Sequence, residues 1–133
     1  MFFDFSVTIP FSTTKAAWQE TALKLTDGVI HHVEVGFPWG PAGLVNVTLW
    51  HQDHQVWPLN PGGSLNSDEE KIAWEDRFPL KTPYNWLKAR CWNLDDTFDH
   101  TVELRFAILP EEEIAVGSLV NRLISVFRKV FRA

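Results

Sequence analysis

Two histidines and an aspartate stand close together in the segment HQDHQ, as His51, Asp53 and His54. Imidazole nitrogens and carboxylate oxygens are ligands of zinc and other transition metals, so these residue types suit a metal site. The two histidines flank a predicted tight turn between strands, where Asp and other polar residues are common because of their turn-forming conformations. No further ligand at a motif spacing completes the set. Turn formation is the simpler interpretation, and metal binding stays open.

A second oxygen-rich segment, LDDTFDH, places Asp95, Asp96 and Asp99 in a predicted loop. Carboxylates in loops of β-sandwich proteins can hold Ca²⁺. The spacing matches no calcium-loop motif, however, and Asp is an ordinary turn-forming residue. These three aspartates are therefore candidate ion contacts, with a plain turn as the alternative.

Tryptophan and phenylalanine are frequent, with 7 Trp and 10 Phe against 1 Tyr. Exposed tryptophan rings can stack on sugar rings, and Trp39 and Trp57 are candidate ligand contacts of this kind. Trp86 and Trp92 alternate with two cationic residues on the predicted outward face of one strand. Since tryptophan is favoured energetically at protein interfaces, we expect Trp86 and Trp92 to lie in a subunit interface.

Motifs of the common enzyme classes are absent from the sequence. It has no nucleophile elbow, phosphate-binding loop, HExxH motif or dinucleotide fingerprint. The adjacent carboxylates Glu75 and Asp76 fall on a predicted strand and so point to opposite faces. We therefore expect neither catalysis nor a cofactor.

The 133 residues suit a single domain with one hydrophobic core. A net charge of −5 argues against nucleic-acid binding by the body of the protein. The single cysteine, Cys91, excludes an intramolecular disulfide and a cysteine-built zinc site. The N-terminal segment lacks a basic region and no apolar run is long enough to span a bilayer, so we expect neither a secretory signal nor a transmembrane segment. The expected location is a virion, or the cytoplasm before assembly.

Alternation of apolar and polar residues predicts eight short strands between residues 1 and 109. In the first, Phe3, Phe5, Val7 and Ile9 share one face. The Asp27-Gly28 pair predicts a β-hairpin between the second and third strands. The predicted strands lie within 2–9, 20–26, 29–37, 44–52, 54–57, 71–78, 84–93 and 101–109.

Eight strands separated by turns, with no helical pattern among them, predict an all-β antiparallel sandwich. A jelly roll has this number of strands, and we expect that fold. An immunoglobulin-like sandwich is the alternative that strand counting leaves open.

After the predicted sandwich of residues 1–109, residues 110–133 predict one amphipathic helix. Its apolar stripe has helical spacing, acidic residues stand at its start and basic residues at its end, which suits the helix dipole. The stripe needs a partner, which is its own sandwich, a sister subunit or a lipid surface, and we favour the sister subunit. The residues expected in that interface are Leu119, Leu123, Phe127, Val130 and Phe131.

The segments LKLTDGVIHHVEVGFPWGPAGLVNVTL, HQVWPLNPGG and NLDDTFDHTVELRFAILP resemble those of small single jelly-roll structural proteins of bacterial viruses and mobile elements, particularly from hot environments. The resemblance covers about residues 20–109 and includes no catalytic motif, so it assigns no site residue. It implies a capsid or virion role in which symmetric copies tile or decorate a shell.

We therefore expect a non-enzymatic structural protein that self-assembles into a symmetric homo-oligomer, as a viral capsid or virion component. Other virion proteins, and a membrane surface contacted by the C-terminal segment, are further candidate partners. The alternative is a β-sandwich module that binds carbohydrate or a cell surface through exposed tryptophans.

Overall fold

The computed structural model describes residues 1–110, which form eight strands and one short 3₁₀ helix. All eight predicted strands are present. The predicted C-terminal helix, with its interface residues, lies outside the described residues. The elements in chain order are β1 (Phe2–Ile9), η1 (Lys15–Ala17), β2 (Gln19–Lys24), β3 (Gly28–Phe37), β4 (Val45–His51), β5 (His54–Trp57), β6 (Glu70–Leu80), β7 (Trp86–Asn93) and β8 (His100–Leu109).

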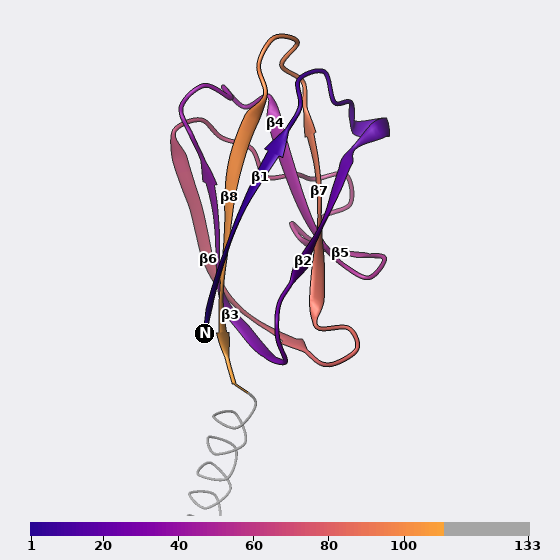
Figure 1. Ribbon diagram of the computed structural model, residues 1–133, viewed down its shortest axis with the longest axis vertical. Coiled ribbons are helices and arrows are strands. Elements are labelled where there is room, and N and C mark those ends of the chain that lie inside the picture. The colour runs from indigo at the N-terminus through magenta and orange to yellow at the C-terminus, as the bar shows by residue number, and fades with distance from the viewer. Residues whose placement is uncertain (111–133) are drawn as a thin grey trace, which may run out of the picture.

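The strands form two four-stranded antiparallel sheets that pack face to face (Figure 1). One sheet has the strand order β1-β8-β3-β6, and the other has the order β2-β7-β4-β5. The first strand thus pairs with the last, the second with the seventh, the third with the sixth and the fourth with the fifth. This nested pairing is the strand order of a jelly roll and differs from that of an immunoglobulin domain, whose sheets join strands ABED and CFG.

The prediction of a hairpin at Asp27-Gly28 is wrong, because β2 and β3 belong to different sheets. The dipeptide instead carries the chain from one sheet to the other. Asp27 Oδ1 accepts hydrogen bonds from Thr82 N and Asn85 Nδ2, at 2.9 and 3.0 Å, and so ties this crossover to the β6–β7 loop. Gly28 has φ +147°, a backbone conformation that residues other than glycine rarely adopt.

The inward faces of both sheets supply the core, as their alternation predicts. In β7, Leu87, Ala89 and Cys91 are fully buried, and in β8 every second residue from Val102 to Ile108 is fully buried. The free thiol of Cys91 is enclosed in this core, and burial raises its pKa to about 12.

The strand registers place two distinct ends on the sandwich. The β1–η1, β3–β4 and β7–β8 connections lie at one end, which is at the top of Figure 1. The start of β1, the end of β8 and the β6–β7 loop lie at the other.

Candidate functional site

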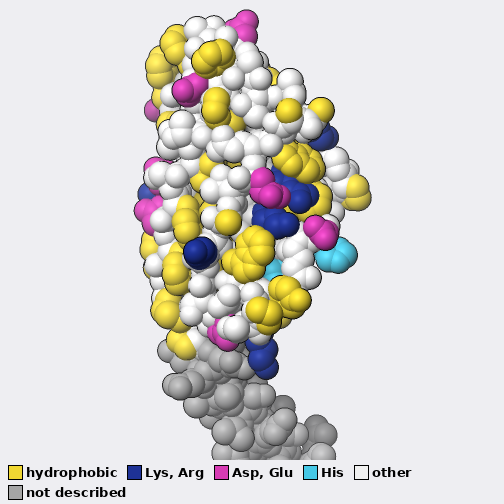
Figure 2. All heavy atoms as spheres, turned by 45° about the vertical axis from the view of Figure 1, so that its right-hand side comes forward, with side chains coloured by type: hydrophobic (Ala, Val, Ile, Leu, Met, Phe, Trp, Pro, Cys, Tyr) yellow, Lys and Arg dark blue, Asp and Glu magenta, His cyan; other side chains and the backbone are white. Residues whose placement is uncertain are grey.

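The outer face of the β2-β7-β4-β5 sheet carries tryptophan rings interleaved with cations, and we call it the tryptophan face. Figure 2 shows Lys and Arg side chains lying among large hydrophobic side chains at mid-height on this side of the molecule. Its aromatic and cationic residues, contributed by the strands and the adjacent η1 segment, are Lys15, Trp18, Lys24, Trp50, Trp86, Lys88, Arg90 and Trp92.

Arg90 is at the centre of this face. Its guanidinium carbon lies 4.8 Å from the centroid of Trp18 and 4.3 Å from that of Trp50, so the cation contacts both indole rings, whose centroids are 5.9 Å apart. Arg90 Nε donates to Glu20 Oε1 at 2.9 Å, and Trp50 Nε1 donates to Thr48 Oγ1 at 2.9 Å. These bonds fix both the cation and the Trp50 ring within the face.

Trp86 and Trp92 occupy different environments, although the sequence predicts the same role for both. Trp86 is half-buried below the Lys88 ammonium, whose nitrogen is 5.5 Å from the ring centroid, and it lines a pocket of about 410 Å³ with Leu25. Trp92 is only 5% exposed, because the η1 segment folds over β7 and places Lys15 Nζ 5.5 Å from its ring. The prediction that Trp92 lies in a subunit interface is therefore wrong, because the η1 segment of the same chain covers its ring.

Large apolar side chains are exposed at the loop end of the sandwich, and we call this group the apolar tip. Its residues are Phe11, Trp39, Leu44, Leu94 and Phe98, of which Trp39 is 79% and Phe98 65% exposed. They come from three connections that lie together, because Leu94 N donates to Leu44 O at 2.9 Å and Phe11 N donates to Asp99 Oδ1 at 2.9 Å. An exposed apolar group of this kind is typical of an interaction site.

Asn93 anchors the backbone of the apolar tip. It is fully buried, and its Nδ2 donates to Ile9 O at 3.1 Å and to Phe98 O at 3.0 Å. Its Oδ1 accepts from Asp95 N at 3.0 Å. One side chain thus ties the end of β1 to both sides of the β7–β8 loop, which holds the exposed residues in a fixed arrangement.

The three candidate ion-contact aspartates bind their own loop rather than a common point. Asp95 Oδ2 accepts from His100 Nε2 at 2.8 Å, and this bond, together with one from Thr97 N, holds the pKa of Asp95 below its usual range. Asp96 accepts from the Thr97 hydroxyl, and Asp99 accepts from a backbone N–H of the β1–η1 connection. These contacts favour the turn interpretation of LDDTFDH.

The HQDHQ segment forms the predicted tight turn, in which His51 and His54 are paired residues of β4 and β5. His51 Nε2 is hydrogen-bonded to Tyr84 O at 2.8 Å, and Asp53 lies 3.9 Å from Lys88 Nζ. Within residues 1–110, no three His, Cys, Asp or Glu side chains are grouped so that they could hold a metal ion.

Trp39 and Trp57, the two candidate ligand contacts, are found in opposite environments. Trp39 is exposed in the apolar tip. Trp57 is only 6% exposed and packs edge-on against Trp74 and Phe78, with ring centroids 6.0 and 5.5 Å away. Its ring fills the space between the two sheets. The prediction that Trp57 contacts a ligand is therefore wrong, and Trp57 is a core residue.

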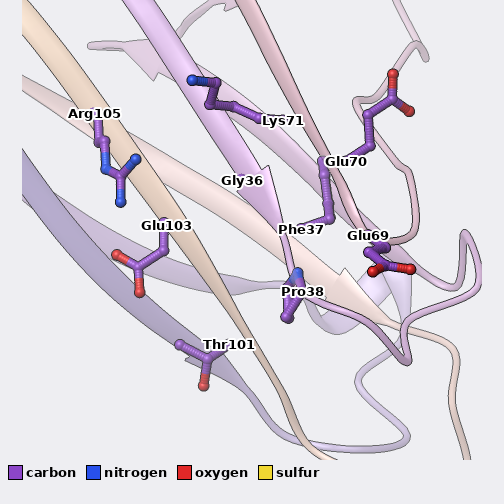
Figure 3. A pocket seen from close by; sticks show the side chains of 9 residues that line it. All are labelled: Gly36, Phe37, Pro38, Glu69, Glu70, Lys71, Thr101, Glu103 and Arg105. Atoms are coloured by element: carbon purple, nitrogen blue, oxygen red, sulfur yellow. The ribbon is translucent and has the colours of Figure 1, made fainter.

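The opposite outer face, on the β1-β8-β3-β6 sheet, is polar and contains an open pocket of about 490 Å³. Glu103 and Thr101 lie on one side of it and Glu69 and Glu70 on the other, with Gly36 between (Figure 3). Beside this pocket, the carboxylate of Glu34 is paired with the basic side chains of Lys71 and Arg105. The hydrogen bond with His32 Nε2 lowers the pKa of Glu34, and the nearby Lys71 and Arg105 lower it further.

Sequence reasoning missed two features of these surfaces. Phe11 lies between two predicted strands, and Leu94 and Phe98 lie in the predicted loop LDDTFDH. Large apolar residues outside the strands are the signal that could have indicated the apolar tip. The second feature is the η1 segment. Nothing in the strand pattern predicts that Lys15 and Trp18 fold onto β7 and β4.

Among residues 1–110, no helix combines the length and the hydropathy that crossing a membrane requires.

Comparisons with known proteins find no matching protein-family model and no matching curated protein. Among solved structures, the chain is similar to the Yersinia pseudotuberculosis-derived mitogen, with a TM-score of 0.44 and 12% identity over 82% of this chain and 86% of that one. It is also similar to a structure of Bacillus endospore appendages, described as disulfide-linked pili, with a TM-score of 0.36 and 7% identity over 82% and 88% of the two chains. Neither similarity is close enough to carry an argument about function.

Proposed function

We propose that this β-sandwich protein is a non-enzymatic structural subunit whose copies assemble into a symmetric homo-oligomer, in the manner of a viral capsid or virion component. The observation that carries the proposal is the apolar tip. Five large apolar side chains are exposed to solvent at one end of the sandwich. The buried Asn93 holds the loops that carry them through hydrogen bonds to their backbone. Covering such a group with protein removes apolar area from water, at roughly 25 cal/mol per Å².

The fixed backbone of the tip favours association because little conformational entropy is lost when a partner binds. The β7–β8 loop that carries Leu94 and Phe98 also carries the exposed carboxylates of Asp96 and Asp99, which suits the polar rim of a protein interface. Trp86 on the tryptophan face, with its adjoining apolar pocket, is a second candidate contact.

The sequence of residues 111–133 supplies a further argument for assembly. Its apolar stripe, which includes Leu119, Leu123, Phe127, Val130 and Phe131, is expected to pair with a sister subunit. The apolar tip and this segment belong to different parts of the chain, so the two contacts can be tested separately.

Light scattering and electron microscopy of the purified full chain test the proposal. The expected result is a discrete particle whose mass is a fixed multiple of the single-chain mass. Phe11→Ser with Phe98→Ser is expected to reduce that mass, and so is Leu123→Asp with Phe127→Asp. Tyr84→Ser is the matched control, since it changes a side chain of similar exposure in the β6–β7 loop at the opposite end.

A chain that stays monomeric at every protein concentration would refute assembly. An unchanged particle mass in the Phe11 and Phe98 double variant would exclude the tip as a contact. The same result for the Leu123 and Phe127 double variant would exclude the C-terminal segment.

A further inference from the structure

We propose that the tryptophan face also binds an acidic polysaccharide, and that a carboxylated sugar ring occupies the pocket beneath the η1 segment. This inference goes beyond assembly and does not depend on it. The pocket measures about 260 Å³ and lies between β4, β5, β7, η1 and the β5–β6 loop. It is smaller than the roughly 300–1,000 Å³ of a site for a drug-sized ligand, which suits one ring of a longer chain.

Aromatic rings line the pocket: Trp18 and Trp50 are accessible there, and Trp92 contributes the small part of its surface that Lys15 leaves exposed. One face of a pyranose ring presents C–H groups and is apolar, so it packs on an indole while its hydroxyls stay at the rim. Trp18 is 37% exposed, and its ring is kept in place by the contact with Arg90. A rigid aromatic wall of this kind binds a ring with little loss of side-chain entropy.

Lys15 supplies the positive charge at the pocket. Its ammonium lies 5.5 Å from the centroid of Trp92, and within residues 1–110 no carboxylate forms an ion pair with it. Arg90, by contrast, is already bound to Glu20 and in contact with two indole rings. Lys15 is therefore the cation that is available to a carboxylate of the ligand.

Polar groups that could recognise sugar hydroxyls are also present. Gln55 lines the pocket, and its Nε2 donates to Pro58 O and Gly63 O, which orients the amide and leaves its oxygen as an acceptor. Gly62 and Gly63 also line the pocket, and neither has a side chain that would fill it.

The charge distribution selects an anionic ligand. The whole chain has a net charge of −5, yet the cations outnumber the acids on this face. The face carries Lys15, Lys24, Lys88 and Arg90 against Glu20 and Asp53. A local positive region on an acidic protein attracts polyanions to that region and away from the rest of the surface.

The test is a tryptophan-fluorescence titration of the full chain with polygalacturonate, and with neutral dextran as the uncharged comparison. A saturable change with polygalacturonate that weakens as salt is added is the expected result. Lys15→Gln should weaken binding about tenfold, because it removes one charge-assisted contact. Trp18→Ala should weaken it by a similar factor. Lys71→Gln, which removes a cation from the opposite sheet, should leave binding unchanged.

Three results would overturn the proposal: no saturable change with polygalacturonate, an equal response to dextran, or an equal loss of binding in the Lys15 and Lys71 variants. Circular dichroism of each variant checks that it is folded. Because Trp86 on the same face is a candidate assembly contact, light scattering measures the oligomeric state of each titrated sample separately from its sugar binding. Failure here and failure of the assembly proposal are therefore distinguishable.

Discussion

Trp57 Nε1 donates a hydrogen bond to Asp76 Oδ2 at 2.8 Å, and this bond joins the two sheets of the sandwich. Trp57 lies on β5, the edge strand of one sheet, and Asp76 lies on β6, the edge strand of the other. The bond and the packing of the Trp57 ring against Trp74 and Phe78 close one open side of the sandwich. Edge strands are sites of unwanted strand pairing, so closing them also protects the fold.

Replacing Trp57 by Phe should lower the free energy of unfolding by about 2 kcal/mol, because it removes the inter-sheet hydrogen bond and part of the packed ring. The hydrogen bond from Trp57 lowers the pKa of Asp76, so that pKa should rise toward its ordinary value of 3.8 in the variant. Urea unfolding and an NMR titration of the carboxyl measure the two effects. The exposed Trp39→Phe is the control, and equal losses in both variants would contradict the role given to Trp57.

The Asp95–His100 pair makes the stability of the apolar tip dependent on pH. Since the folded pKa of Asp95 lies below the ordinary 3.8, the ionised carboxyl stabilises the fold above about pH 4. This contribution is lost as the pH falls from there through the folded pKa. In Asp95→Asn, the urea midpoint should be lower at pH 7 and should fall less steeply between about pH 4 and 2.

Asp96→Asn is the matched control for this pH dependence, since Asp96 is exposed and, among residues 1–110, its carboxylate accepts a hydrogen bond only from the Thr97 hydroxyl. It should retain the wild-type slope. If Asp95→Asn showed the wild-type slope as well, the hydrogen bond with His100 would not be the source of the acid sensitivity.

Gly28 is required at the crossover between the sheets. A Cβ atom there would lie 2.3 Å from Leu109 O and 2.7 Å from Ile108 Cγ2, so the alanine variant must displace the end of β8. Gly28→Ala should cost about 3 kcal/mol or more of unfolding free energy, measured by thermal or urea unfolding. Gly62 also has a positive φ, of +79°, but a Cβ atom added there would meet no atom within 4 Å. Gly62→Ala should therefore lower the free energy of unfolding by only about 1 kcal/mol.

Cys91 should resist thiol reagents in the folded protein. The thiol is fully buried and its pKa is raised to about 12, so the reactive thiolate is scarce at neutral pH and reagents cannot reach it. The chromogenic disulfide reagent DTNB should react with it only after unfolding in urea. Fast labelling without denaturant would show that the core around β7 opens locally.

The sequence alone determined the strands and most of their inward faces. Alternation requires only neighbouring residues, so Leu87, Ala89 and Cys91 could be assigned to one buried face without knowing what covers them. The tight turn between His51 and His54 was predictable for the same reason, since a short connection between paired strands is local.

The tertiary structure decided which strands pair and which aromatic rings are exposed. Asp27-Gly28 has the residues of a hairpin turn, but β2 pairs instead with β7, where Leu23 and Leu87 lie opposite each other, and β3 pairs with β6 and β8. These pairings join residues far apart in the chain, and no local pattern encodes them. The exposure of the tryptophans depends likewise on distant segments. Trp92 is covered by the η1 segment, and Trp57 is covered by strand β6. Trp39 remains exposed to solvent. Local alternation sets the direction in which a side chain points, whereas burial depends on what the rest of the chain places over it.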